Sequence, residues 1–191
     1  MEVVCVRQGD KYGQEYVLML RRMVKKFLNK DLICLGDDVP MKSGYEGFWS
    51  KMELFSPWVN FRPCLYFDLD TFILDDCTDL LIETDDLWLI RDFYNKDRSN
   101  SGVMILPTDT ERIWENHFKW TRNTADGDFL TTQPHRILQD RFMGITSRKV
   151  SNGVKEPSRI TSYHGHLKPH NDEGWGKEIW KTWTSPHFSE N

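Results

Sequence analysis

Two carboxylates follow an apolar run near the middle of the chain. The segment 63–71 reads Pro-Cys-Leu-Tyr-Phe-Asp-Leu-Asp-Thr, so the apolar residues lead directly into Asp68 and Asp70. Side chains of a strand alternate between its faces, and this spacing predicts that both carboxylates point the same way where the strand ends. Ligands of open α/β sheets bind just outside the carboxyl ends of such strands. Two carboxylates in that place suit a hard divalent cation.

A second Asp-x-Asp pair, Asp126 and Asp128, lacks this context. The first pair has an apolar strand before it and the run Thr71-Phe72-Ile73-Leu74 behind it, whereas the second has neither. A solvated acidic turn explains the second pair as well as a functional site does. Asp68 and Asp70 are therefore the primary candidates.

The composition predicts one folded domain. The chain has 191 residues, enough for a single continuous core, and 28% of them are charged and 13% aromatic, which excludes a disordered chain. The net charge of -4 and a pI near 5.9 provide no basic stripe, so a nucleic-acid partner is not expected.

The cysteines and the start of the chain bear on its location. Cys5, Cys34, Cys64 and Cys77 form no C-x-x-C pair, and three of them lie in apolar runs, as buried cysteines of a reducing compartment do. The acidic start at residues 1–7 does not resemble a signal peptide, and no window reaches about 18 apolar residues. A cytoplasmic protein without a transmembrane segment is expected.

The first elements predict a βαβ unit. Residues 3–7 and 32–35 form apolar strands, and the apolar spacing over 14–28 predicts an amphipathic helix between them. Such a connection is right-handed. A ligand of this unit is expected to bind at the carboxyl ends of its strands, beside the loop 9–13 and beside Asp37 and Asp38.

The later elements continue the α/β pattern. In chain order the sequence predicts a helix over 47–55, strands over 63–67 and 87–90, a loop over 91–100 and a strand over 101–106. A helix should then run from a capping box at 108–111 to residue 120. The remainder is predicted to contain loops over 121–127 and 149–157, a strand from 159 that breaks at 165, and a Trp-bearing segment over 174–183. No repeat or linker divides the chain. Residues 1–191 are expected to form a single domain, with a nucleotide-binding half at about 1–106 and an acceptor and closing half at about 107–191.

The order of these features resembles a GT-A glycosyltransferase. The motifs that carry the resemblance are the βαβ unit, Phe67-Asp68-Leu69-Asp70, Asn100-Ser101-Gly102-Val103-Met104, Gly127-Asp128, and His164-Gly165-His166-Leu167-Lys168-Pro169. The pattern is most similar to the retaining group that includes glycogenin and the bacterial lipopolysaccharide galactosyltransferases. The resemblance implies a single Rossmann-like α/β domain whose mixed, mostly parallel central sheet is flanked by helices.

The resemblance also implies a donor and a metal. Asp68 and Asp70 correspond to the DxD motif of the family, which holds manganese, or magnesium, against the two phosphates of a UDP-sugar. Tyr12 stands at the position where the family stacks an aromatic ring on uracil. Asp37 or Asp38 stands at the position where a carboxylate of the family contacts the base. Lys51 takes the place of a basic residue near the diphosphate, Asn100 and Ser101 match contacts to the donor sugar, and Lys168 matches the lysine that touches the leaving phosphate.

Two positions depart from the family pattern. The metal-binding histidine of the family lies six positions before its lysine, where this chain has Ser162, so His164 either takes over the ligand role or lines the site. Phe129 replaces the Gln of the family's G-D-Q, after Gly127 and Asp128. Asp128 is the candidate that holds acceptor or donor hydroxyls, or that acts as the base if the reaction inverts the sugar.

The expected activity is transfer of a hexose-type sugar from a UDP-sugar to a glycan or another hydroxyl acceptor, with retention of configuration. A cation and a lysine aimed at the departing diphosphate stabilise the charge that develops there. One alternative is a phosphotransferase of the haloacid dehalogenase type, although Phe72 stands where that family has Thr or Val and the motif does not lie on the first strand. A non-catalytic nucleotide-sugar-binding domain is a second alternative.

The tryptophans near the end of the chain have two further interpretations. Trp175, Trp180 and Trp183 could form a sugar-stacking platform or an interfacial membrane contact. We expect instead that they pack the end of the chain onto the domain.

Overall fold

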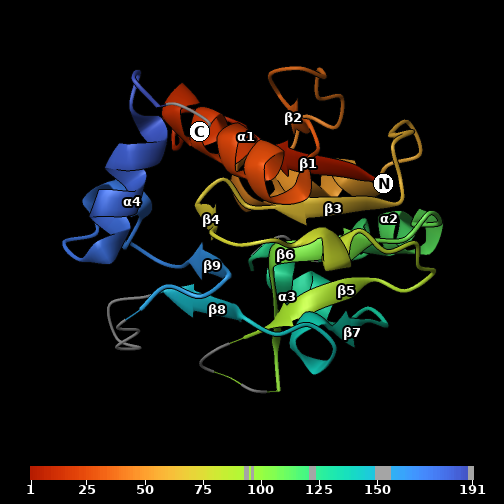
Figure 1. The fold of residues 1–191 in the computed structure, drawn as a ribbon. Helices are drawn as coiled ribbons and strands as arrows, with labels where there is room; N and C mark the ends of the chain where they lie inside the picture. Colours follow the sequence, from red (N-terminus) through yellow and green to blue (C-terminus); the bar gives the residue numbers. More distant parts are fainter. Residues whose placement is uncertain (93–94, 96, 121–123, 149–155, 189–191) are drawn as a thin grey trace.

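The computed structural model describes residues 1–92, 95, 97–120, 124–148 and 156–188. A six-stranded sheet forms the centre of the molecule, and a three-stranded sheet lies beside it (Figure 1). In spatial order the central sheet contains β2 (Leu32–Leu35), β1 (Glu2–Val6), β3 (Cys64–Phe67), β6 (Ser99–Leu106), β5 (Trp88–Arg91) and β7 (Arg136–Ile137).

The strand directions confirm the predicted mixed, mostly parallel sheet. β1 pairs in parallel with both β2 and β3, and β5 pairs in parallel with β7. β6 lies between β3 and β5 and is antiparallel to both. Because β6 runs in the opposite direction, its first residues lie at the edge of the sheet where β1 and β3 end.

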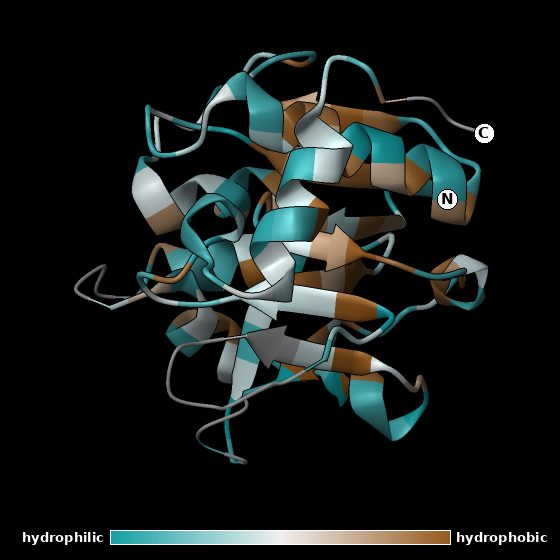
Figure 2. Cartoon of the chain, turned by 60° about the vertical axis from the view of Figure 1, so that its left-hand side comes forward, coloured by the Kyte–Doolittle hydropathy of each residue, from teal (hydrophilic) through white to brown (hydrophobic). Residues whose placement is uncertain are grey.

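Helices cover both faces of the central sheet (Figure 1). α1 (Gln14–Leu28) and α4 (Trp175–Thr184) pack against one apolar cluster, whereas η1 (Gly47–Phe55), α2 (Glu111–His117) and α3 (Asp126–Thr131) pack against the other. In β1, Val3 and Cys5 belong to the first cluster and Val4 and Val6 to the second. Burial on both faces explains why these strands read as continuous apolar runs. Figure 2 shows the contrasting pattern on α1, where hydrophilic and hydrophobic residues alternate along the ribbon.

The smaller sheet brings the last third of the chain to the end of β3. It contains β4 (Thr71–Ile73), β9 (Ile160–Tyr163) and β8 (Ile145–Arg148), in that order. β4 follows Asp70 directly and pairs antiparallel with β9. The amide of Tyr163 donates a hydrogen bond to the carbonyl of Asp70 at 3.1 Å. The segment after β9 therefore begins beside the two carboxylates.

Three short 3₁₀ helices, η2 (Thr78–Leu80), η3 (Leu138–Asp140) and η5 (Pro169–Asn171), complete the elements described here. The predicted βαβ unit is confirmed, and α1 spans the predicted range. The Trp-bearing segment forms α4, and its tryptophans pack on the core as expected. The four cysteines are free and buried.

Several predicted boundaries are wrong. β6 begins at Ser99, inside the predicted loop, and α3 begins at Asp126 inside another. The predicted capping box at 108–111 does not form, because α2 begins only at Glu111, whose amide donates to Asp109 Oδ1 at 3.0 Å, and α2 ends at His117. Most of the predicted loop over 149–157 lies outside the described residues.

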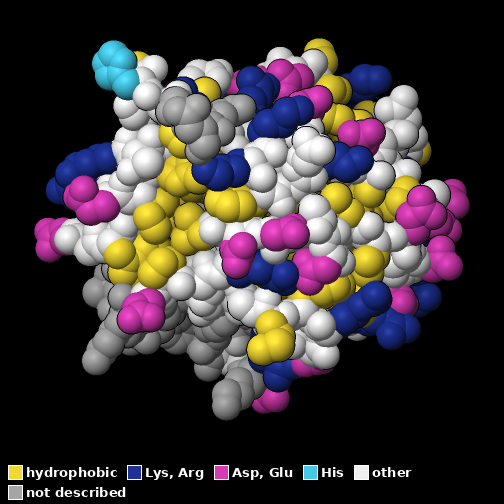
Figure 3. All heavy atoms as spheres, viewed as in Figure 1, with side chains coloured by type: hydrophobic (Ala, Val, Ile, Leu, Met, Phe, Trp, Pro, Cys, Tyr) yellow, Lys and Arg dark blue, Asp and Glu magenta, His cyan; other side chains and the backbone are white. Residues whose placement is uncertain are grey.

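The surface seen in Figure 3 carries interspersed acidic and basic side chains, together with an apolar patch over α4. Both signs of charge meet near the centre of this face. None of the helices in the described ranges has the length and apolar character needed to cross a membrane.

Two glycines that follow β2, Gly36 and Gly44, should differ in how much stability an alanine substitution costs. Gly36 has φ +99°, and a Cβ added there would lie 1.9 Å from the carbonyl oxygen of Arg7, whereas Gly44 has φ +67° and open space around it. Gly44→Ala should lower the free energy of unfolding by about 1 kcal/mol, the cost of the left-handed backbone. Gly36→Ala should cost about 3 kcal/mol or more, because the backbone must also move. Urea unfolding of the two variants measures the difference, and equal losses would contradict it.

Candidate functional site

A cavity of about 570 Å³ opens at the edge of the central sheet where β1 and β3 end. Its walls come from the loop after β1, from η1, from the turn after β3, from the first residues of β6 and α3, and from the segment after β9. The volume falls in the range typical of small-molecule sites. The cavity therefore lies where ligands of open α/β sheets bind.

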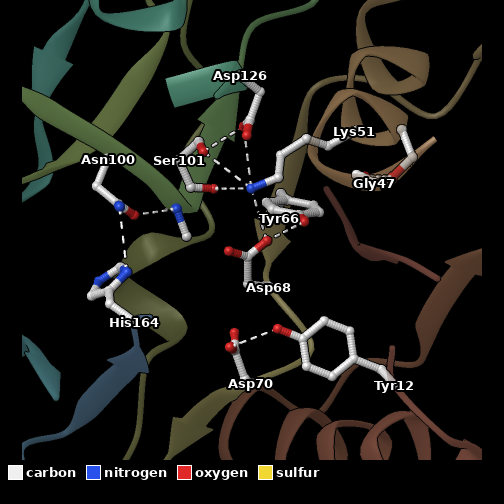
Figure 4. A network of polar contacts seen from close by, with 12 residues as sticks. Tyr12, Gly47, Lys51, Tyr66, Asp68, Asp70, Asn100, Ser101, Asp126 and His164 are labelled. Atoms are coloured by element: carbon white, nitrogen blue, oxygen red, sulfur yellow. Dashed lines mark hydrogen bonds and ion pairs between the residues drawn. The ribbon is translucent and has the colours of Figure 1, made fainter. Parts of the chain in front are cut away.

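Asp68 is held on the side of the cavity formed by η1 (Figure 4). Its Oδ1 accepts a hydrogen bond from the Tyr66 hydroxyl at 2.5 Å and forms an ion pair with Lys51 Nζ at 2.9 Å. Burial raises the pKa of Asp68, but Lys51 and the Tyr66 hydroxyl outweigh burial, so the pKa lies below its usual value. Asp68 is therefore a carboxylate at neutral pH.

Asp70 is held by different elements. Its Oδ2 accepts a hydrogen bond from the Tyr12 hydroxyl at 2.8 Å and forms an ion pair with Lys168 Nζ, and the residue is 1% exposed. Both carboxylates line the cavity, but strand alternation does not place them there, because β3 ends at Phe67 and Asp70 lies in a turn. Each aspartate thus has one oxygen bound by a lysine and a tyrosine.

Lys51 connects three elements at the wall of the cavity (Figure 4). Its Nζ lies 2.9 Å from Asp68 Oδ1, 3.3 Å from Asp126 Oδ2 and 3.0 Å from Ser101 Oγ. Burial lowers the pKa of Lys51, but Asp126 and Asp68 outweigh burial and raise it above its usual value. The ammonium is therefore charged and fixed by its partners.

Asn100 and Ser101 enter the cavity from the start of β6. Asn100 Oδ1 accepts a hydrogen bond from the amide of Gly102 at 2.7 Å, and its Nδ2 lies 3.5 Å from His164 Nδ1. The hydroxyl of Ser101 donates to Asp126 Oδ2 at 2.6 Å. The antiparallel direction of β6 is what brings both residues to the predicted donor site.

The polar atoms around the two aspartates fit a divalent cation. His164 Nε2, Ser162 Oγ and Thr71 Oγ1 are buried without a hydrogen-bond partner among the described residues. A Cβ on Gly102 would lie 2.5 Å from Ser162 Oγ and 3.5 Å from Asp68 Oδ2, so the glycine keeps the space between these oxygens open. Carboxylate oxygens, a hydroxyl and a neutral imidazole are ligand types that Mn²⁺ accepts.

The side chains around the two aspartates do not by themselves form a complete metal site. The described residues contain no group of three or more His, Cys, Asp and Glu side chains gathered as ligands. Within the described part of the chain, the hydrogen bonds and ion pairs of the two aspartates end on Asp68 Oδ1 and Asp70 Oδ2, so Asp68 Oδ2 and Asp70 Oδ1 are available to a cation. Phosphate oxygens of a bound substrate would supply further ligands.

Three of the predicted site residues lie outside the residues that line the cavity. Asp37 pairs with Arg7 at 2.8 Å, and Asp38 pairs with Arg21 at 2.6 Å. Asp128 pairs with Arg98 at 3.1 Å on the outer side of α3. The structure brings together the other predicted residues, namely Tyr12, Lys51, Asp68, Asp70, Asn100, Ser101, His164 and Lys168.

The sequence did not identify several residues that the structure places in the cavity. Asp126 is 3% exposed and bonded to Lys51 and Ser101, although its sequence context fits a solvated surface turn equally well. Tyr66 could have been found, because a tyrosine two positions before Asp68 is near enough to donate its hydroxyl to that carboxylate, as the structure shows. Lys11 and Phe48 also line the cavity, and Lys11 Nζ lies 5.4 Å from the ring centre of Phe48.

Comparison with known proteins finds similar folds but no similar sequences. No protein-family model and no curated protein matches the chain. The galactosyltransferase LgtC, solved in complex with donor and acceptor sugar analogues, superimposes with a TM-score of 0.65 at 14% identity, over 96% of this chain and 95% of that one. The glycosyltransferase GlyE of Streptococcus pneumoniae TIGR4 gives 0.64 at 16% identity, over 98% of this chain and 61% of that one.

A third similar structure is the bifunctional glycosyltransferase WbbM, with a TM-score of 0.66 at 10% identity, over 97% of this chain and 49% of that one. The likeness is to LgtC-like glycosyltransferases of the GT-A type. At this level of identity it shows the fold. The predicted fold class is therefore confirmed.

The burial of His164 predicts a pH dependence of stability in the metal-free protein. Burial lowers the pKa of His164 below 6.5, although Asp70 and Asp68 act in the opposite direction. A depressed histidine pKa means that the unfolded chain takes up a proton first, so stability is lost as the pH falls below about 6.5. His164→Gln should therefore lose less stability than the wild type between pH 7.5 and 5.5.

Urea unfolding with a chelator at both pH values measures this difference. All other groups are common to the two proteins, so their contributions cancel in the comparison. A difference between wild type and variant that does not change with pH would contradict the depressed pKa.

Proposed function

We propose that the protein is a glycosyltransferase that moves a hexose-type sugar from a UDP-sugar to a hydroxyl of a glycan or another acceptor. The observation that carries the proposal is the pair Asp68 and Asp70, which lines a cavity at the carboxyl ends of β1 and β3 in a GT-A fold. Lysines from three separate elements, Lys11, Lys51 and Lys168, line the same cavity. A site with two available carboxylate oxygens and several cations suits a nucleoside diphosphate bound with a metal ion.

The residues divide into a base end and a phosphate end. Tyr12 lines the cavity from the loop after β1, where its ring can stack on uracil, while its hydroxyl holds Asp70. Asp37 and Asp38 lie at the end of β2, and either could meet the base only after leaving its arginine. Asn100, Ser101 and Asp126 offer an amide, a hydroxyl and a carboxylate to the sugar hydroxyls.

The departing diphosphate requires compensation of its growing negative charge. Asp68, Asp70 and His164 would hold Mn²⁺ or Mg²⁺, which would neutralise the phosphate oxygens when bound. Among the described residues Lys168 forms its ion pair with Asp70, so two of its three N–H groups can turn to a phosphate. The positive charge of Lys168 would stabilise the negative charge that grows on the phosphate oxygen as its bond to the sugar breaks.

Retention of the anomeric configuration is part of the proposal. Inversion needs a carboxylate free to accept the acceptor's proton. Among the described residues, the carboxylates lining the cavity are Asp68, Asp70 and Asp126, and each pairs with a lysine. In a front-face reaction the acceptor hydroxyl loses its proton toward the leaving phosphate, and no protein base is required.

The other functions considered receive less support. A phosphotransferase would use Asp68 as a nucleophile, but its Oδ1 is bound by Tyr66 and Lys51, as expected for an orienting role. A non-catalytic domain would bind UDP-sugar without breaking it down, so release of UDP separates the two cases. A cytoplasmic location and the absence of a nucleic-acid partner remain predictions.

The metal-bridge proposal predicts which nucleotide stabilises the protein. UDP, rather than GDP or ADP, should raise the melting temperature, and Mn²⁺ should be required. At a concentration of about 100 Kd the stabilisation is about 2.7 kcal/mol, or about 5 to 10 °C for a domain of this size. Asp70→Asn should abolish the effect of Mn²⁺ while the circular dichroism spectrum stays unchanged. Thermal shift measurements with and without chelator provide the test.

Asp86→Asn is the matched control, because Asp86 is a surface partner of Arg136 at 2.5 Å, away from the cavity. This variant should respond to UDP and Mn²⁺ like the wild type. Equal stabilisation of the wild type by UDP with and without chelator would rule out the metal bridge.

The proposed stereochemistry has its own test. NMR assignment of the product formed from a donor of known anomer should show the same anomeric configuration. Asp128→Asn should then keep most of its activity, since Asp128 lies outside the cavity lining. An inverted product that is lost in Asp128→Asn would make Asp128 the base.

A further inference from the structure

We propose that two of the three lysines that line the cavity have separate tasks: Lys51 is a positioning residue that fixes Asp68 and Asp126, and Lys11 contacts the phosphates of the donor. This inference rests on the proposed function for its ligand. It gives Lys11 a role that the sequence did not suggest. It also replaces the diphosphate contact that the family resemblance implied for Lys51 with a positioning role.

The hydrogen-bonding capacity of Lys51 is already used. An ammonium has three N–H donors. Around Lys51 Nζ the structure places four acceptors, which are Asp68 Oδ1 at 2.9 Å, Ser101 Oγ at 3.0 Å, Asp126 Oδ2 at 3.3 Å and the Ser101 carbonyl at 3.4 Å. The residue is 8% exposed. A phosphate could bind Lys51 only by displacing one of these partners.

The charges around Lys51 explain why it must stay. Lys51, Asp68 and Asp126 together carry a net charge of about -1, and without the lysine two partly or fully buried carboxylates would face each other unpaired. Asp126 begins α3, Asp68 follows β3, and Lys51 belongs to η1. The ammonium therefore joins three elements and fixes which oxygen Asp68 presents to the cavity.

Lys11 has the opposite character. Its Nζ lies over the rings of Tyr12 and Phe48, at 4.9 and 5.4 Å from their centres, and it forms no ion pair or hydrogen bond with the other described residues. Burial and the charge of Lys168 lower the pKa of Lys11 from its usual value, although Asp70 and Asp68 act in the opposite direction. Lys11 is thus a cation at the cavity wall whose N–H groups remain available to an anion.

A melting-temperature cycle tests the role of Lys51 without any ligand. Lys51→Met should lower the melting temperature by about 10 °C, as expected when one partner of a buried ion pair is removed. The double variant Lys51→Met/Asp126→Asn keeps the net charge of the cluster and should recover at least half of this loss. Equal losses from Lys51→Met in the wild-type and Asp126→Asn backgrounds would overturn the positioning role.

Isothermal titration of UDP in saturating Mn²⁺ tests the division of tasks. Lys11→Met should weaken UDP binding about 10-fold or more, as expected for hydrogen bonds to a charged group, with an unchanged melting temperature. Lys11→Arg should restore most of the affinity. Lys177→Met, on the exposed side of α4, is the matched control and should bind UDP like the wild type. The folded double variant should bind UDP within about 3-fold of Asp126→Asn, because Lys51 makes no phosphate contact.

Two results would overturn the inference: normal UDP binding by Lys11→Met, or a loss of more than about 10-fold in the double variant relative to Asp126→Asn. Failure of the wild type to bind any nucleoside diphosphate would instead contradict the proposed function, and with it the role of Lys11. The melting-temperature cycle decides the role of Lys51 in either case.

Discussion

Burial of carboxylates at one edge of the central sheet is the constraint on which the other parts of the site depend. Asp70 and Asp126 are almost inaccessible, and an isolated charge in such a place is very unfavourable. The chain meets this requirement with Lys51 from η1 and Lys168 from the segment after β9. The placement of both segments therefore follows from electrostatics as well as from apolar packing. Because a lysine holds each of these carboxylates, their charge is compensated within the chain itself.

The parts of the fold that could be predicted are those whose residues carry a local signal. Four strands of the central sheet, β1, β2, β3 and β5, contribute side chains to both apolar clusters or to their borders and read as apolar runs, and α1 shows its helical period. β7 and β8 carry no such signal, because they are short and are stabilised by pairing with distant segments. The capping box predicted at 108–111 is wrong because the helix begins only at Glu111, after Thr110, whose hydroxyl makes a tertiary hydrogen bond to the carbonyl of Phe55.

The candidate site was predictable wherever a motif fixed the element and its direction. Asp68, Asn100 and Lys168 reach the cavity because the order of strands brings their segments to one edge. Asp126 and Asp128 could not be distinguished by sequence, since both belong to one Asp-x-Asp pair. They begin a helix, where positions i and i+2 lie about 200° apart, so one faces the cavity and the other solvent.

The ion pair between Asp70 and Lys168 joins positions 98 residues apart. During synthesis the earlier part of a chain leaves the ribosome first, so β1, β2, β3 and β6 can assemble while Lys168 has not yet been made. A nascent chain at that stage has its carboxylates in place without one of their cations, and α1 lacks the cover of α4. The site can therefore be completed only after the segment that follows β9 has been synthesised.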